Sequence, residues 1–240
     1  MNNIVLLVVF ILGIVLMQFV QAQSVEDIIN KYLEARGGKD KLKAIKSIYM
    51  EGSREMMGTM MAVKVTVVNG KLFRKDFEFG GISGYTMVTP TEGWSLIPMQ
   101  SEKAKTITAN TLITMQEELD IAGPMTDYIP KGHKAELQGK EIVNGCQAYK
   151  INVRLRTGNE ITYYIDKETY LLIQSRRISA AVNYELQEIV TDYRDYKLFD
   201  GIMFPQTISN PGSSIMAGST TFNTIVLNKN IDESEYIPSC

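Results

Sequence analysis

The fold is decided by one stretch, Met61–Phe79, which reads MAVKVTVVNGKLFRKDFEF. Two runs rich in β-branched and aromatic residues, Met61–Val68 and Lys71–Phe79, flank the dipeptide Asn69-Gly70. A two-residue type I′ turn needs positive φ at both positions, so this pattern predicts a β-hairpin. The aromatic residues of the second run alternate with polar ones, as expected for a strand with one apolar face.

Short strand-like runs separated by turn residues continue on both sides of this hairpin. Asn144-Gly145 and Gly158-Asn159 mark further tight turns. The succession is typical of a meander, sandwich or barrel. The strands do not alternate with helices, which argues against a parallel sheet. The other predicted strands are Ser47–Glu55, Tyr85–Val88, Gly93–Ile97, Lys103–Ile107, Ala135–Glu141, Gln147–Leu155, Ile161–Asp166, Leu171–Ile178, Tyr184–Tyr196, Met203–Ser209 and Thr220–Asn228.

Helical patterns precede and interrupt the strands. Ser24 with Asp27 forms a capping-box pattern, and Gly37-Gly38 ends the helix that follows it. A short helical turn covers about Lys39–Ile45. The residues from Thr111 to Asp120 form a second amphipathic segment, which must pack on a face of the sheet or across its mouth.

The first 22 residues predict a secretory signal peptide. They carry no charge, and the apolar run Ile4–Met17 is shorter than the roughly 20 residues of a membrane-spanning helix. The alternative is an uncleaved membrane anchor. We expect cleavage after Ala22, export to the periplasm, and one domain over residues 23–240.

The composition argues against nucleic-acid binding and leaves open whether the protein has a disulfide. The formal net charge is −2, without the basic surplus of a nucleic-acid-binding protein. Cys146 and Cys240 are the two cysteines, which an exported protein could pair; whether they do is open.

Catalytic patterns are sparse. The single histidine, His133, lies between a glycine and a lysine in a predicted loop, where a solvated side chain is the simpler interpretation than a catalytic base. One histidine and two distant cysteines make no zinc set, and no calcium loop or phosphate-binding loop is present. Paired carboxylates of a glycoside hydrolase are not visible in a sequence, so that alternative stays open.

Methionine is concentrated near the first strands. Five of the 13 methionines lie between Met50 and Met61. Methionine is over-used on surfaces that accept varied apolar partners, and it also fills gaps in ordinary cores. Both interpretations, a cavity rim and a core, stay open.

Several segments together carry a resemblance to a known family: Tyr32–Gly38, Leu42–Ile48, Gly70–Arg74, Glu92–Pro98, Tyr164–Asp166, Tyr193–Tyr196 and Asp200–Pro205. In their order and spacing the chain resembles the LolA-like family, the outer-membrane lipoprotein-sorting proteins and their bacterial relatives. The resemblance implies a mainly β fold, an open antiparallel half-barrel of about 11 strands with helices covering the concave apolar face. It also implies a periplasmic location and acyl chains bound in the cavity.

The leading hypothesis is therefore a non-catalytic carrier or binding protein for lipids, acyl chains or lipoproteins. Such a carrier would need no cofactor or metal. Its partners would be a lipid or acylated protein and an outer-membrane or envelope protein, not nucleic acid. The family's basic residue for cargo hold and release has no clear equivalent, although Lys71 or Arg74 could substitute. The candidate cavity residues are Phe73, Phe77, Phe79, Trp94, Leu112, Met115 and Leu119.

Phe73, Phe77 and Phe79 share one strand face, while Arg74 and Glu78 share the other with Asp76. An ordinary core face explains that stripe as well as a cavity wall does. The alternative function is a structural or interaction module of the cell envelope with a collapsed interior, and a hydrolase is a third hypothesis.

Overall fold

The computed structural model describes residues 23–56, 58–98, 100–180, 186–212 and 217–238 of the 240. The predicted signal peptide, residues 1–22, lies outside the described residues, as does Cys240. Within these ranges, every helix falls short of the length and apolarity that membrane crossing requires.

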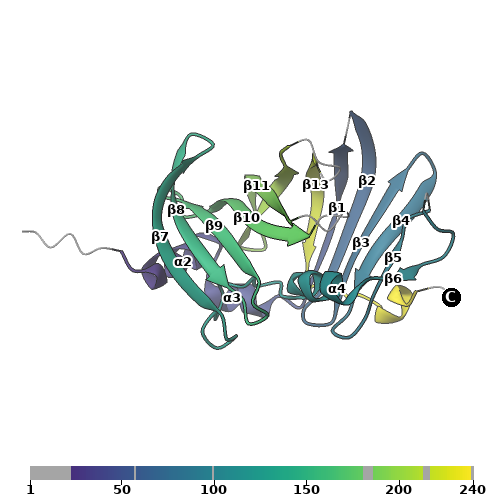
Figure 1. The fold of residues 1–240 in the computed structure, drawn as a ribbon, viewed down its shortest axis with the longest axis horizontal. Helices are drawn as coiled ribbons and strands as arrows, with labels where there is room; N and C mark the ends of the chain where they lie inside the picture. The colour runs from purple at the N-terminus through teal and green to yellow at the C-terminus, as the bar shows by residue number, and fades with distance from the viewer. Residues whose placement is uncertain (1–22, 57, 99, 181–185, 213–216, 239–240) are drawn as a thin grey trace, which may run out of the picture.

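Thirteen strands form one antiparallel sheet in the order β6-β5-β4-β3-β2-β1-β13-β12-β11-β10-β9-β8-β7 (Figure 1). One half contains β1 (Ser47–Met56), β2 (Thr59–Val68), β3 (Leu72–Phe79), β4 (Ile82–Val88), β5 (Gly93–Leu96) and β6 (Lys105–Thr106). The other contains β7 (Lys134–Val143), β8 (Cys146–Arg154), β9 (Glu160–Asp166), β10 (Leu172–Ala180), β11 (Leu186–Phe199), β12 (Ile202–Asn210) and β13 (Gly218–Leu227).

The predicted open antiparallel half-barrel is confirmed, since β6 and β7 lie at opposite ends of the strand order and do not pair. All thirteen strands predicted from the residues join the sheet, against the about 11 that the resemblance implies. The four-residue β5 and the two-residue β6 extend one edge.

The sheet consists of two meanders joined at their first and last strands. Ser47 begins β1, and its backbone carbonyl accepts a hydrogen bond from Asn228, just beyond β13 (2.9 Å). Next to this junction, the ladder between β12 and β13 has four residue pairs among the described residues, from Thr207–Thr221 to Asn210–Gly218. Residues 107–133, which we call the crossing segment, connect the two outer edges of the sheet.

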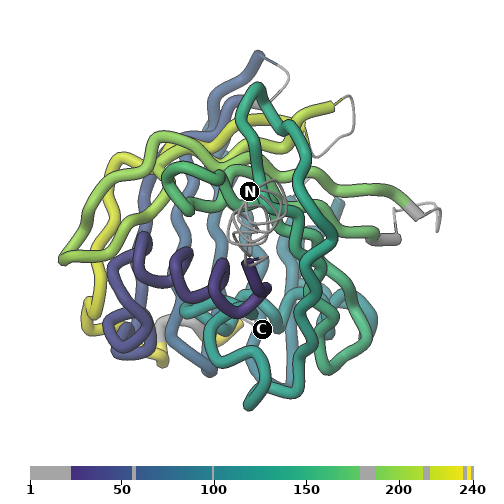
Figure 2. The backbone as a smooth tube through the Cα atoms, turned by 90° about the vertical axis from the view of Figure 1, so that its left-hand side faces the viewer, coloured from purple at the N-terminus to yellow at the C-terminus, as the bar shows by residue number. Residues whose placement is uncertain are grey.

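Among the described residues, two helices precede the sheet. α2 (Val25–Ala35) begins at the predicted capping box, in which Ser24 and Asp27 exchange hydrogen bonds, and α3 (Lys39–Ala44) follows. Figure 2 views the molecule from one end, and there α2 (purple) lies within the curve of the strands. Its apolar side is buried in the main core, so the helix covers part of the concave side.

The crossing segment contains α4 (Ala109–Met115) and the 3₁₀ helix η1 (Gln116–Leu119). The single helix predicted for Thr111–Asp120 is therefore two elements, because the last turn tightens to 3₁₀ geometry, as helix ends often do. A further 3₁₀ turn, η2 (Glu233–Tyr236), follows β13.

The main core joins the helices to one face of the sheet. Ile28 and Ile29 of α2, Leu42 of α3 and Leu119 of η1 pack with apolar side chains from both halves of the sheet. A fully buried Ile or Leu contributes about 1.5–3 kcal/mol. We call this the concave face; the opposite, outer face carries two smaller apolar clusters.

Candidate binding site on the concave face

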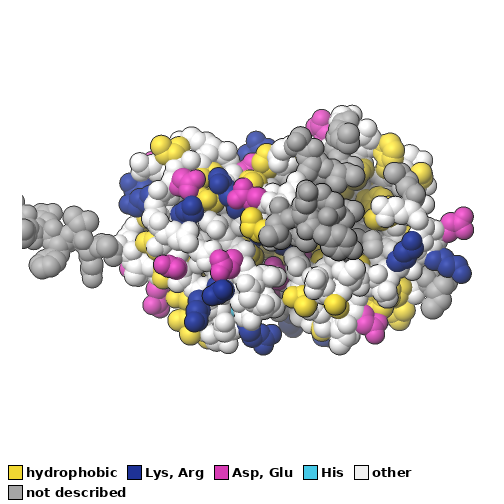
Figure 3. Space-filling model, viewed as in Figure 1, with side chains coloured by type: hydrophobic (Ala, Val, Ile, Leu, Met, Phe, Trp, Pro, Cys, Tyr) yellow, Lys and Arg dark blue, Asp and Glu magenta, His cyan; other side chains and the backbone are white. Residues whose placement is uncertain are grey.

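The concave face of β2 and β3 is apolar along most of its length. Val63, Val65 and Val67 are all buried there, and the register pairs Val67 with Phe73 and Val63 with Phe77. Since side chains alternate between the two faces of a strand, Phe79 lies on this face too. Figure 3 shows hydrophobic side chains on the right-hand half of the molecule, beside atoms that are not described.

Towards the hairpin tips, this apolar surface becomes accessible. Phe79 is 45% exposed and its cross-strand partner Ile82 is 42% exposed. Phe77 and Met61 are half-buried on the same face. We call Met61, Phe77, Phe79 and Ile82 the rim patch. Its members are large apolar side chains on the inner side of a curved sheet that keep contact with solvent.

The methionines divide between the two interpretations. Met50 and Met61 pack against the main core, whereas Met60, in the first hairpin, is 57% exposed. Met57 lies outside the described residues.

The crossing segment borders the same surface. Leu112 and Ile107 lie over Gly93 of β5, so closely that a Cβ at Gly93 would meet the Ile107 side chain at 2.5 Å. Met115 packs against the main core and Leu119 is buried in it. The structure thus brings three candidates, Leu112, Met115 and Leu119, to the concave side with Phe73 and Phe77.

Polar contacts hold the crossing segment to both halves of the sheet. Gln116 donates a hydrogen bond to the Pro90 carbonyl (2.6 Å), and Gly70 N–H donates to the Leu119 carbonyl (2.8 Å). On the opposite half, Asn159 donates to Glu117 (2.8 Å), which also lies 3.8 Å from Arg177. Burial raises the pKa of Glu117, although both of these partners oppose the shift.

The concave face of β1 and β3 carries the basic side chains Arg54 and Lys75 beside apolar ones. Lys75 lies between Phe73 and Phe77 on β3 and pairs with Val65 and Thr86 on the adjacent strands. Burial lowers the pKa of Lys75, as does Arg54, whereas Glu118 opposes the shift. Arg54 is buried at the far end of β1 and donates a hydrogen bond to Thr220 (3.0 Å).

Tyrosines line the concave side of the other half. Tyr163 is buried on β9, and burial raises its pKa well above the ordinary value. Burial likewise raises the pKa of Tyr193 to about 12, and Tyr193 shares a hydrogen bond with Ser175 (3.0 Å). The Tyr196 hydroxyl donates to the Leu172 carbonyl (2.8 Å). These phenols stay neutral at physiological pH and act as hydrogen-bonding groups.

Trp94 does not belong to this surface, contrary to the prediction. It pairs with Met87 on β4 and packs beside Leu72 and Tyr85 in an outer-face cluster. The physical reason is strand parity, since Gly93, the residue before it, pairs with Val88 on the concave side.

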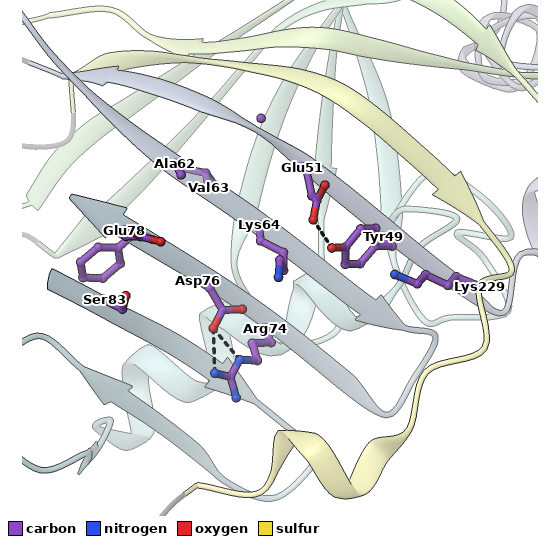
Figure 4. A pocket seen from close by; sticks show the side chains of 12 residues that line it. Tyr49, Glu51, Ala62, Val63, Lys64, Arg74, Asp76, Glu78, Ser83 and Lys229 are labelled. Atoms are coloured by element: carbon purple, nitrogen blue, oxygen red, sulfur yellow. Dashed lines mark hydrogen bonds and ion pairs between the residues drawn. The ribbon is translucent and has the colours of Figure 1, made fainter. Parts of the chain in front are cut away.

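The outer face carries the basic residues considered for cargo hold and release. Arg74 forms an ion pair with Asp76 (2.7 Å) and lies over the Tyr85 ring (4.3 Å). Lys71 pairs with Glu233 (3.1 Å) on the surface. Arg74 and Asp76 line a hollow of about 670 Å³ on this face. Figure 4 shows them there with Tyr49, which donates a hydrogen bond to Glu51. Charges of both signs line this hollow, and among them Arg74 pairs with Asp76.

The described residues contain few groups arranged for catalysis. His133 Nδ1 accepts a hydrogen bond from the Arg156 backbone N–H (3.0 Å), and burial lowers its pKa, so it holds a loop. No three His, Cys, Asp or Glu side chains gather at a metal-binding distance in the described part of the chain. Cys146 is exposed, and its pairing with Cys240 stays open because Cys240 is not described.

Sequence reasoning missed Lys75 and Arg54 on the concave face. The signal for Lys75 was present, because it shares the strand parity of Phe73, Phe77 and Phe79. Arg54 carried no such signal: its position follows from the pairing of β1 with β13, which places it beside Thr220.

Comparison with known proteins finds this fold in solved structures. A LolA superfamily protein from Nitrosomonas europaea matches with a TM-score of 0.57 at 11% identity, covering 90% of this chain and 100% of that one. A DUF1329 family protein from Desulfovibrio piger matches with a TM-score of 0.52 at 13% identity, covering 90% and 98%. A domain described as an outer membrane lipoprotein-sorting protein, from Vibrio parahaemolyticus, matches with a TM-score of 0.52 at 12% identity, covering 89% and 95%.

No protein-family model and no curated protein matches the chain. The structural matches confirm the predicted LolA-like fold. At identities of 11–13%, the likeness concerns the fold alone.

Proposed function

We propose that this protein is a non-catalytic carrier or binding protein of the cell envelope that holds the acyl chain of a lipid or lipoprotein against its concave face. The observation that carries the proposal is the rim patch, in which Phe79 and Ile82 are nearly half exposed on the inner side of the sheet. Burying an acyl chain there gains about 0.8 kcal/mol per methylene, so binding needs no catalytic group.

The fold supports this assignment. A domain described as an outer membrane lipoprotein-sorting protein has the same fold. In this chain the helices pack on the concave face, and the rim patch keeps contact with solvent. The uncharged, apolar N-terminal segment is consistent with export to the periplasm. An envelope or outer-membrane protein would then deliver or receive the cargo.

The test is to express the full chain in a bacterial host, purify it without detergent and record native mass spectra before and after organic extraction. We expect a stoichiometric acyl species that extraction removes, and recovery of binding when a fluorescent fatty acid is added. A protein that carries no lipid and takes up no fatty acid contradicts the proposal and favours an interaction module.

Matched variants localise the binding. Phe79→Glu places a charge in the rim patch at a half-exposed position, so we expect normal folding and loss of fatty-acid uptake. Trp94→Glu places the same charge on the outer face, and we expect uptake to persist. Circular dichroism of both variants checks the fold. Equal loss in both, with the fold intact, would remove the concave face as the binding surface.

A further inference from the structure

The cationic side chains of the concave face narrow the ligand class. Lys75 interrupts an otherwise apolar stripe, with Phe73 on one side and Phe77 and Phe79 on the other. A charged amine in such a place costs free energy unless it meets an opposite charge. Positions that break the local apolar pattern at such a cost are candidates for function.

Within the described residues, the Lys75 amine forms no hydrogen bond and no ion pair, and Glu118 of η1 supplies an opposing charge. Glu118 is exposed, and Arg54 adds a second positive charge. The acid that opposes the Lys75 charge thus faces solvent and forms no ion pair with it among the described residues.

The distance along β3 suits an amphiphile. Lys75 and Phe79 are four residues apart on the same face, which corresponds to about 13 Å of extended strand. Phe77 lies between them, and Ile82 continues the apolar surface at the rim. If the head group of a ligand binds at Lys75, its acyl chain lies along the rim patch, and the end of that acyl chain lies near solvent.

Building on the proposed function, we propose that the concave face selects amphiphiles with one anionic head group, a carboxylate or a phosphate, which Lys75 binds while the acyl chain lies along Phe77 and Phe79. Charge-assisted hydrogen bonds to an ammonium are about twice as strong as neutral ones, and the apolar surroundings strengthen them.

The experiment measures the affinity of the full chain for three probes of equal chain length below their micelle concentrations. The probes are lauric acid, its lysophosphatidic acid and its uncharged monoacylglycerol. We expect the two anionic probes to bind at least tenfold more tightly than the monoacylglycerol. The stronger of the two identifies the head group as carboxylate or phosphate.

Three variants test the role of Lys75. Lys75→Met removes the charge and keeps the apolar stem, so we expect about a tenfold loss for the anionic probes and none for the monoacylglycerol. Lys75→Arg should restore most of the anionic affinity. Lys64→Met removes a lysine from the outer face of β2 and should change nothing.

The outcomes separate this inference from the proposed function. If no probe binds, the proposed function fails. If all three bind equally, or Lys75→Met weakens them equally, acyl binding stands and head-group selection is overturned. If inorganic phosphate displaces the lysophosphatidic acid at equal concentration, the acyl chain contributes nothing and the site is a simple anion site.

Discussion

The ring of Phe77 lies directly over Gly84 in the neighbouring strand. A Cβ built on Gly84 would come within 2.3 Å of Phe77 Cζ and within 2.5 Å of the Leu96 backbone oxygen. Because Gly84 has no side chain, the Phe77 ring packs closely against β4 within the rim patch.

Gly84→Ala should therefore destabilise the protein and disturb the rim patch. We expect a loss of about 1–3 kcal/mol, the usual cost of overpacking, and weaker fatty-acid uptake. Thermal unfolding and fluorescence titration check the two effects. Ser83→Ala, one residue away on the outer face, is the control and should change neither; an unaffected Gly84→Ala would show that Phe77 moves freely.

The pair Gly37-Gly38 offers a test of close backbone contact. Both residues have positive φ, but a Cβ at Gly37 would lie 2.2 Å from the Gly201 carbonyl oxygen, whereas Gly38 faces open space. Gly38→Ala should cost about 1–3 kcal/mol from backbone strain alone. Gly37→Ala should cost clearly more, because α2 must also move away from the β11–β12 turn. Urea unfolding of both variants checks this; equal losses would contradict it.

Glu117 connects the crossing segment to Asn159, just before β9, and to Arg177 of β10. Its raised pKa determines whether the stability of the fold rises or falls with pH. A carboxyl group whose pKa is raised in the folded state destabilises folding as the pH rises through that range. Glu117→Gln keeps the acceptor for Asn159 and removes the buried charge, so it should leave stability at pH 7 unchanged or higher.

Glu117→Ala is the matched comparison, since it removes the acceptor itself. It should lose about 1–3 kcal/mol, because the Asn159 amide is left without its partner. Melting temperatures of both variants at pH 7 and pH 4 provide the measurement. A large loss for Glu117→Gln at pH 7 would show that the charge, through Arg177, stabilises the segment.

Asp127 gives the opposite pH dependence. It forms ion pairs with Lys39 and Lys43 of α3, which lower its pKa from 3.8 to about 2. The stability from these pairs is present above the unfolded-state value and is lost as the pH falls towards 2. Asp127→Asn keeps a residue that tolerates the positive φ of 52° at this position.

We expect Asp127→Asn to lower the free energy of unfolding at pH 7 by less than about 1 kcal/mol, because both lysines are half exposed. The difference from the wild-type protein should shrink between about pH 4 and pH 2. Urea unfolding at several pH values measures it. A constant difference over that range would assign the effect to the backbone.

Most of the fold followed from local patterns in the sequence, and the site followed only in part. Asn69-Gly70 predicted the hairpin, and the capping box at Ser24 predicted α2, because both depend on neighbouring residues. Trp94 was misplaced because its face depends on how β5 pairs with β4. Arg54 was missed because β1 and β13 meet across most of the chain. Long-range pairing of this kind leaves no periodic signal in a single sequence.

The junction of β1 with β13 also orders the events of folding. Residues 47–56 must wait for residues 218–227, whereas every other neighbouring pair in the strand order is a sequential hairpin or short connection. Contacts between distant segments form late because loop closure costs entropy. A nascent chain would thus hold the β1–β6 meander with β1 as an unpaired edge, open to aggregation until synthesis reaches β13.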